Sequence, residues 1–236
     1  MSTYLSVIKD LTEKRITALE YTRRAYEGKV YWFDTFLFTK EDLSRIYADS
    51  PTSLGKKTTY YFTMGMSIAG LLDMQTAVDF IKAMSALVHE YEIMTTPHDT
   101  GARPVSAASH GRGGLRRVLT GQSRIFRSSR ARQEESKVAE TEFTYLMTPY
   151  LPFELNFLET VVTLCDVLVN MYVRIQDLLL SEENYLPSAI GDSFIRMDTK
   201  VKKLIVTPLI NDIEEMCRRN VRNEVNDLEH VVMGHV

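Results

Sequence analysis

The segment FELNFLETVVTLCDVLVNMYVRIQDLLL, residues 153–180, carries the clearest structural pattern in the chain. Its apolar side chains recur at alternating four- and three-residue steps, which place them on one face of a helix. They are Phe157, Val161, Leu164, Leu168, Met171, Ile175 and Leu178. A second stripe beside it consists of Leu158, Val162, Cys165, Val169, Tyr172 and Leu179. Because a two-stranded coiled coil needs only one stripe, the pair predicts a central helix with neighbours on two sides.

Helical periods also occur before this segment. They predict a helix over residues 3–27, a second from Thr39 as N-cap to about residues 49–51, and a third over 73–94 with Asp73 as its cap. Residues 58–72 are rich in small and β-branched side chains, and their pattern is weaker.

After the segment, a further amphipathic helix is predicted from Ile190 to Leu204, and the apolar pattern continues beyond Pro208. Because proline has no backbone N–H to donate, the helix either kinks there or restarts with Thr207 as its cap. The chain shows no βαβ alternation, hairpin dipeptide or internal repeat. The predicted fold is therefore all-α, a helical bundle of five to six helices.

Length and composition place the chain among ordinary globular proteins. It has 236 residues, of which 44% are hydrophobic and 25% are charged. Its two cysteines have no paired spacing, and charged residues interrupt the N-terminal region where a secretory signal would need an apolar run. No stretch is apolar enough for a transmembrane helix. We therefore expect a cytoplasmic or nuclear protein.

An arginine-, glycine- and serine-rich stretch interrupts the helical pattern at residues 97–139 and predicts a long disordered basic insert. It would separate an N-terminal helical half, 1–96, from a C-terminal half, 140–236, with both halves packing into one domain. Residues 101–133 contain no Asp, Glu or Lys, so their formal charge is +8, and the rest of the chain carries −11. The arginines are Arg103, Arg112, Arg116, Arg117, Arg124, Arg127, Arg130 and Arg132.

This insert is either a passive linker or a docking strip. Arginine pairs bidentately with phosphate oxygens, so the strip would suit nucleic acid, an anionic membrane or a phosphoprotein. Apolar residues among the arginines also allow a basic amphipathic helix over 114–131, although Gly121 weakens it. Three serines beside arginines are candidate phosphorylation sites, namely Ser123, Ser128 and Ser129.

Aromatic side chains concentrate at residues 30–38, VYWFDTFLF, which contain the only tryptophan. Periodicity alone does not decide between a short strand and a buried helical turn. The cluster is either core packing at a helix junction or an interface anchor, since aromatic residues dominate binding energy at protein contacts. Trp32, Phe33 and Phe36 are the candidate partner-binding residues here.

No catalytic, cofactor or metal motif holds up in the sequence. His89-Glu90 begins like a zinc-protease helix, but Ile93 stands where the second ligand is required. The glycines at 111, 113 and 114 match neither a phosphate-binding loop nor a dinucleotide site. We therefore expect a non-enzymatic protein-interaction or scaffold subunit of an intracellular complex, without cofactor or metal. The alternatives are binding of phosphate-bearing partners through 101–133 and an enzyme with a pocket between helices.

Overall fold

The structure is a computed structural model in which residues 3–48, 51–96, 143–181 and 186–232 are described. Its helices are α1 (Thr3–Tyr26), α2 (Lys40–Ala48), α3 (Pro51–Ala69), α4 (Ala77–Thr95), α6 (Phe157–Ser181), α7 (Ser188–Val201), the π-helical segment η1 (Lys202–Val206) and α8 (Thr207–Val232). Since α7, η1 and α8 follow one another without a break, the described residues form six continuous helices. The predicted all-α fold is confirmed, while the predicted basic insert lies outside the described residues.

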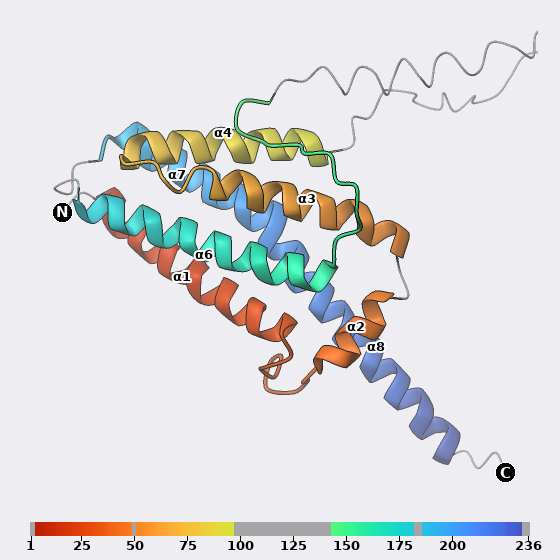
Figure 1. The fold of residues 1–236 in the computed structure, drawn as a ribbon. Coiled ribbons are helices and arrows are strands. Elements are labelled where there is room, and N and C mark those ends of the chain that lie inside the picture. The colour runs from red at the N-terminus through yellow and green to blue at the C-terminus, as the bar shows by residue number, and fades with distance from the viewer. Residues whose placement is uncertain (1–2, 49–50, 97–142, 182–185, 233–236) are drawn as a thin grey trace, which may run out of the picture. The chain divides into compact units, whose positions relative to one another are not determined.

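Helix α6 is the centre of the compact unit that the helices form. It packs along α1 on one side and along α3 on the other, as Figure 1 shows, while α7 lies against α4 and α1. The first apolar stripe of α6 is buried along its whole length, and Val161, Leu168 and Met171 are fully inaccessible. Burying each such side chain contributes roughly 1.5–3 kcal/mol to folding. The predicted central position of this helix is confirmed.

The N-cap predicted from the sequence is found in the structure for α2 but not for α4. Thr39 caps α2 as predicted, because its Oγ1 accepts the N–H of Asp42 at 3.2 Å. Helix α4 starts only at Ala77, where Thr76 Oγ1 accepts the N–H of Asp79 at 3.2 Å. The prediction of Asp73 as the cap is therefore wrong, since Asp73 lies in the turn that precedes Thr76.

Helix α3 shows why residues 58–72 gave a weak pattern. Several of its buried positions carry hydroxyl groups instead of apolar side chains, including Thr58, Thr63 and Ser67. Thr58 Oγ1 donates to the Leu54 carbonyl and Ser67 Oγ donates to the Thr63 carbonyl, each at 2.7 Å. These bonds one turn back along the helix use the hydroxyl protons, which lets polar side chains occupy buried positions.

The chain stays helical through Pro208, so the helix does not end and restart there. In η1 the turn widens, and the N–H of Thr207 donates to the carbonyl of Lys202, five residues back. Val201, Lys202 and Thr207 all keep right-handed helical dihedrals. In a regular α-helix the proline ring would clash with the carbonyl four residues earlier, and the wider turn gives it room. None of the helices in the described residues has both the length and the apolarity needed to cross a membrane.

Candidate interaction surface

Only some of the candidate residues predicted from the sequence lie in the part of the chain that the structure describes. The arginines of 101–133 and the three candidate phosphoserines lie outside the described residues. Of the aromatic candidates, Trp32 is buried at 4% exposure, Phe36 is half-buried and Phe33 is 69% exposed. The segment around them is neither a strand nor a helical turn, and it is instead a tight turn closed by an isolated bridge between Trp32 and Phe36. That part of the sequence prediction is corrected.

The turn has an unusual backbone for its sequence. Phe33 and Asp34 have φ angles of 48° and 53°, and the N–H of Thr35 donates to the Trp32 carbonyl at 3.1 Å. Two successive positive φ angles inside such a turn are typical of the type I′ hairpin turn, which strongly prefers Asn and Gly. For a residue such as phenylalanine, the left-handed region costs roughly 1–2 kcal/mol.

Tyr21 of α1 holds the turn in this conformation. Its hydroxyl accepts the N–H of Phe33 at 2.9 Å and donates to the Tyr31 carbonyl at 2.8 Å. Its ring stacks on Trp32 with the centroids 5.1 Å apart, and the Phe33 ring meets Trp32 edge-on at 5.3 Å. The turn is thus fixed by a hydrogen-bonded frame, and Trp32 forms the buried base on which the Phe33 ring rests.

The outer side of this turn is apolar and accessible. Tyr31, Phe33 and Leu37 are 54%, 69% and 41% exposed, respectively. We call these three residues the hairpin surface. Gly28, with φ of 71°, closes the base of the loop, since a Cβ there would lie 2.8 Å from the Phe38 carbonyl oxygen. The loop therefore presents large apolar side chains from a rigid base.

A groove with a cavity of about 660 Å³ lies among α2, α3 and residues 149–158. Tyr47 and Phe157, whose ring centroids lie 4.5 Å apart, line it from the helices. Pro149, Tyr150 and Phe153 line it from the connecting segment, and Tyr150 and Phe153 are also 91% and 61% exposed. This groove is a second aromatic feature that the sequence reasoning missed.

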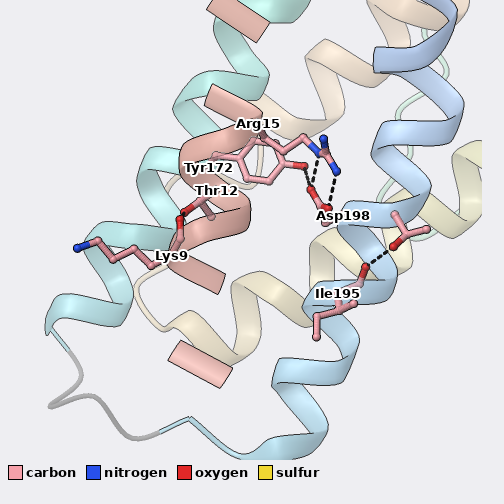
Figure 2. A network of polar contacts seen from close by, with 7 residues as sticks. Lys9, Thr12, Arg15, Tyr172, Ile195 and Asp198 are labelled. Atoms are coloured by element: carbon pink, nitrogen blue, oxygen red, sulfur yellow. Dashed lines mark hydrogen bonds and ion pairs between the residues drawn. The ribbon is translucent and has the colours of Figure 1, made fainter. Parts of the chain in front are cut away.

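A buried polar network joins α1, α6 and α7, as Figure 2 shows. Arg15 donates two hydrogen bonds to Asp198, from Nε at 2.8 Å and from Nη2 at 2.9 Å. The hydroxyl of Tyr172 donates a third to Asp198 at 2.8 Å. Asp198 is 2% exposed, so this carboxylate is held by protein donors in place of water.

The protonation states of these three residues suit a structural link between helices. Burial favours the neutral form of Arg15, but its hydrogen bonds to Asp198 and the charge of Asp198 outweigh this and raise the pKa of the guanidinium. Burial, followed by the charge of Asp198, raises the pKa of Tyr172 well above its ordinary value. Arg15 therefore stays charged and Tyr172 stays neutral, and both are engaged with one carboxylate.

The nucleophile and metal candidates of the described residues are limited. Burial, with a smaller effect from Asp166, raises the pKa of Cys165 to about 12, so its thiol is protonated at neutral pH. Across residues 3–48, 51–96, 143–181 and 186–232, no three His, Cys, Asp or Glu side chains are grouped so that they could hold a metal ion. The most distinctive accessible features of these residues are therefore aromatic.

Comparison with known proteins gives no match to a family model, to a curated protein or to a solved structure.

Proposed function

We propose that this chain is a non-enzymatic protein-interaction module, a scaffold subunit of an intracellular complex, which binds a protein partner through the hairpin surface. The observation that carries the proposal is the position of Phe33, which is 69% exposed and has a φ of 48°. Strained backbone positions persist where the surrounding structure over-determines them, and they concentrate at functional sites.

The composition of the surface favours a protein partner. Aromatic side chains dominate the energy of protein–protein contacts, and a rigid presentation reduces the entropy lost on binding. Phe33 meets both conditions, because its N–H is bonded to Tyr21 and its ring rests on Trp32. The charged side chains nearby, such as Lys29 and Lys40, are exposed and suit a polar rim.

A non-enzymatic role is supported by the state of the network of Arg15, Tyr172 and Asp198 and by that of Cys165. Arg15, Tyr172 and Asp198 satisfy one another, and a catalytic group would need an open position for a substrate. The thiol of Cys165 is buried on the central helix and protonated. These groups fit a structural role.

The proposal is tested by placing a photo-crosslinking phenylalanine analogue at position 33 of the full chain in cells. The matched control places the same analogue at Val173, an exposed apolar position on α6. We expect a discrete protein adduct from position 33 and none of the same mass from position 173. With the captured partner purified, Phe33→Ala should weaken binding by at least about tenfold, the loss expected of an anchor residue.

Trp32 provides a second readout that needs no label. It is the only tryptophan of the chain and contacts both Tyr21 and Phe33, so its fluorescence should change when the partner covers the hairpin surface. An adduct pattern identical at both positions, or a partner that binds Phe33→Ala as tightly as the unchanged chain, would overturn the proposal.

A second candidate function is binding of nucleic acid or an anionic membrane through residues 101–133. The observation that favours it is charge segregation, since these residues carry +8 in a chain whose net charge is −3. Such binding should weaken steeply with salt and disappear when the eight arginines are replaced by glutamine. Binding that is insensitive to salt would exclude it.

A further inference from the structure

The segment that leads into α6 has two prolines in an exposed, non-helical stretch. Its sequence is TPYLPFE over residues 148–154, in which Pro149 and Pro152 stand three residues apart. Tyr150 is 91% exposed, which makes it the most accessible large apolar side chain of the described residues, and Phe153 is 61% exposed. Both prolines and Thr148 are exposed as well. We call residues 148–154 the proline strap.

The proline strap is fixed at both ends. Before it, one carboxylate oxygen of Glu90 accepts the backbone N–H groups of Tyr145 and Leu146 at 2.9 and 2.8 Å, and Ser67 Oγ accepts that of Met147 at 2.9 Å. Leu146 is buried at 4% exposure. After it, Asn156 caps α6 by accepting the N–H of Glu159 at 3.1 Å. Figure 1 shows this segment in green, passing from α4 across α3 to the start of α6.

The local sequence restricts the backbone between these anchors as far as Pro152, where the chain bends. Each proline fixes its own φ near −65°, and the residue before a proline is driven toward extended or polyproline II conformations. Thr148 and Leu151 precede the prolines, so four of the five residues from 148 to 152 are restricted in this way. The cavity of about 660 Å³ between the strap and helices α2 and α3 leaves its inner side unpacked as well.

We infer that the proline strap is a ligand segment, recognised by a partner protein whose groove is lined by aromatic side chains and reads proline-containing extended peptides. Such grooves bind polyproline II segments with prolines three residues apart, because this helix has three residues per turn and presents them on one side. Glu154 is the last residue of the strap and is exposed, so the matching groove carries a basic residue at that end. This surface is separate from the hairpin surface and does not depend on it.

The test measures binding of the full chain to a panel of purified SH3, WW and EVH1 domains, which read such segments. We expect at least one domain to bind, and Pro149→Ala with Pro152→Ala to weaken that binding at least about tenfold. Tyr31→Ala removes an exposed aromatic side chain from the hairpin surface and is the matched control, which should bind as the unchanged chain does. Loss of binding in the control as well would contradict the assignment to the strap.

A peptide of residues 147–155, MTPYLPFEL, keeps the test independent of folding. It should compete for the same domain, and more weakly than the intact chain, because the anchored strap has less freedom to lose on binding. Absence of binding to every domain of the panel, or an unchanged affinity of the double proline variant, would overturn the inference. Neither result would affect the crosslinking test at position 33, so the two proposals fail separately.

Discussion

Two arginine–aspartate pairs tie α1 to other helices, and they differ in their exposure. The side chains of Arg15 and Asp198 are 13% and 3% exposed, and those of Arg23 and Asp166 are 30% and 47% exposed. In both pairs the nitrogen–oxygen distance is 2.8 Å. An exposed pair contributes about 0–1 kcal/mol, because water screens it. Removing one partner of a buried pair costs far more, since the other charge is left buried without compensation.

Asp198→Asn should therefore lower the free energy of unfolding by about 3–5 kcal/mol, while Asp166→Asn should lower it by no more than about 1 kcal/mol. Asparagine keeps the size of the side chain in both variants, so the comparison isolates the charge. Urea unfolding followed by circular dichroism measures both values. Equal losses in the two variants would show that burial does not determine the strength of these pairs.

Neither pair could be predicted from the sequence, because the partners are 183 and 143 residues apart. Periodicity identifies the face of a helix that is buried, but it does not identify the side chain that meets a buried charge from another helix. Asp198 stands within the amphipathic pattern of α7, where an acidic residue normally marks the solvent side. The same limit applies to Ser67 and Glu90, whose partners on residues 145–147 become evident only in three dimensions.

At the scale of elements, the turn at Phe33 offers a test of strain against function. Replacing Phe33 with Asn and Asp34 with Gly supplies the residues that a type I′ turn prefers. The relief of strain, roughly 1–2 kcal/mol per left-handed residue, opposes the loss of the Phe33–Trp32 contact, worth about 0.5–1.5 kcal/mol. Strain at the two left-handed residues together amounts to roughly 2–4 kcal/mol, so we expect the double variant to be at least as stable as the unchanged chain.

The same double variant should lose binding to the partner captured at position 33, as measured by the fluorescence of Trp32. Preserved stability with lost binding is the signature of a side chain kept for recognition. A loss of stability above about 2 kcal/mol would mean instead that Phe33 holds the loop together.

The start of α4 gives a second test at this scale. Thr76→Ala removes the oxygen that accepts the N–H of Asp79 and should cost about 1 kcal/mol. Asp73→Ala is the control, and it should change stability by less than about 0.5 kcal/mol because Asp73 lies outside the helix. Thermal unfolding of both variants measures the difference, and a larger effect at Asp73 would contradict the observed cap.

These elements show which features a one-dimensional pattern can reveal. The long helices α1 and α6 were predictable because a repeated period identifies a buried face over many turns. The turn at Phe33 was not predictable, since two successive left-handed residues that are Phe and Asp violate the preference for Asn and Gly on which hairpin prediction relies. Pro149 and Pro152 were visible in the sequence, but their exposure and the anchors around them were not.

At the scale of the whole molecule, buried tyrosines make the stability of the bundle depend on pH. Five helices each contribute one tyrosine whose pKa burial raises above the ordinary value, namely Tyr26, Tyr47, Tyr61, Tyr91 and Tyr172. In the unfolded chain these hydroxyls titrate near pH 10. Because the folded state keeps the proton at a pH where the unfolded state releases it, stability falls as pH rises above about 10.

These tyrosines should therefore leave the stability of the bundle unchanged up to about pH 9. At higher pH, each tyrosine should lower the free energy of unfolding by up to about 1.4 kcal/mol per pH unit. Ultraviolet absorbance of tyrosinate and the helical circular dichroism signal, recorded in one titration, test this. The buried tyrosines should ionise together with unfolding, so the tyrosinate signal and the loss of helix should coincide. If these five tyrosines ionised near pH 10 while the helices remained intact, the interior described for α1, α3, α4 and α6 would be wrong.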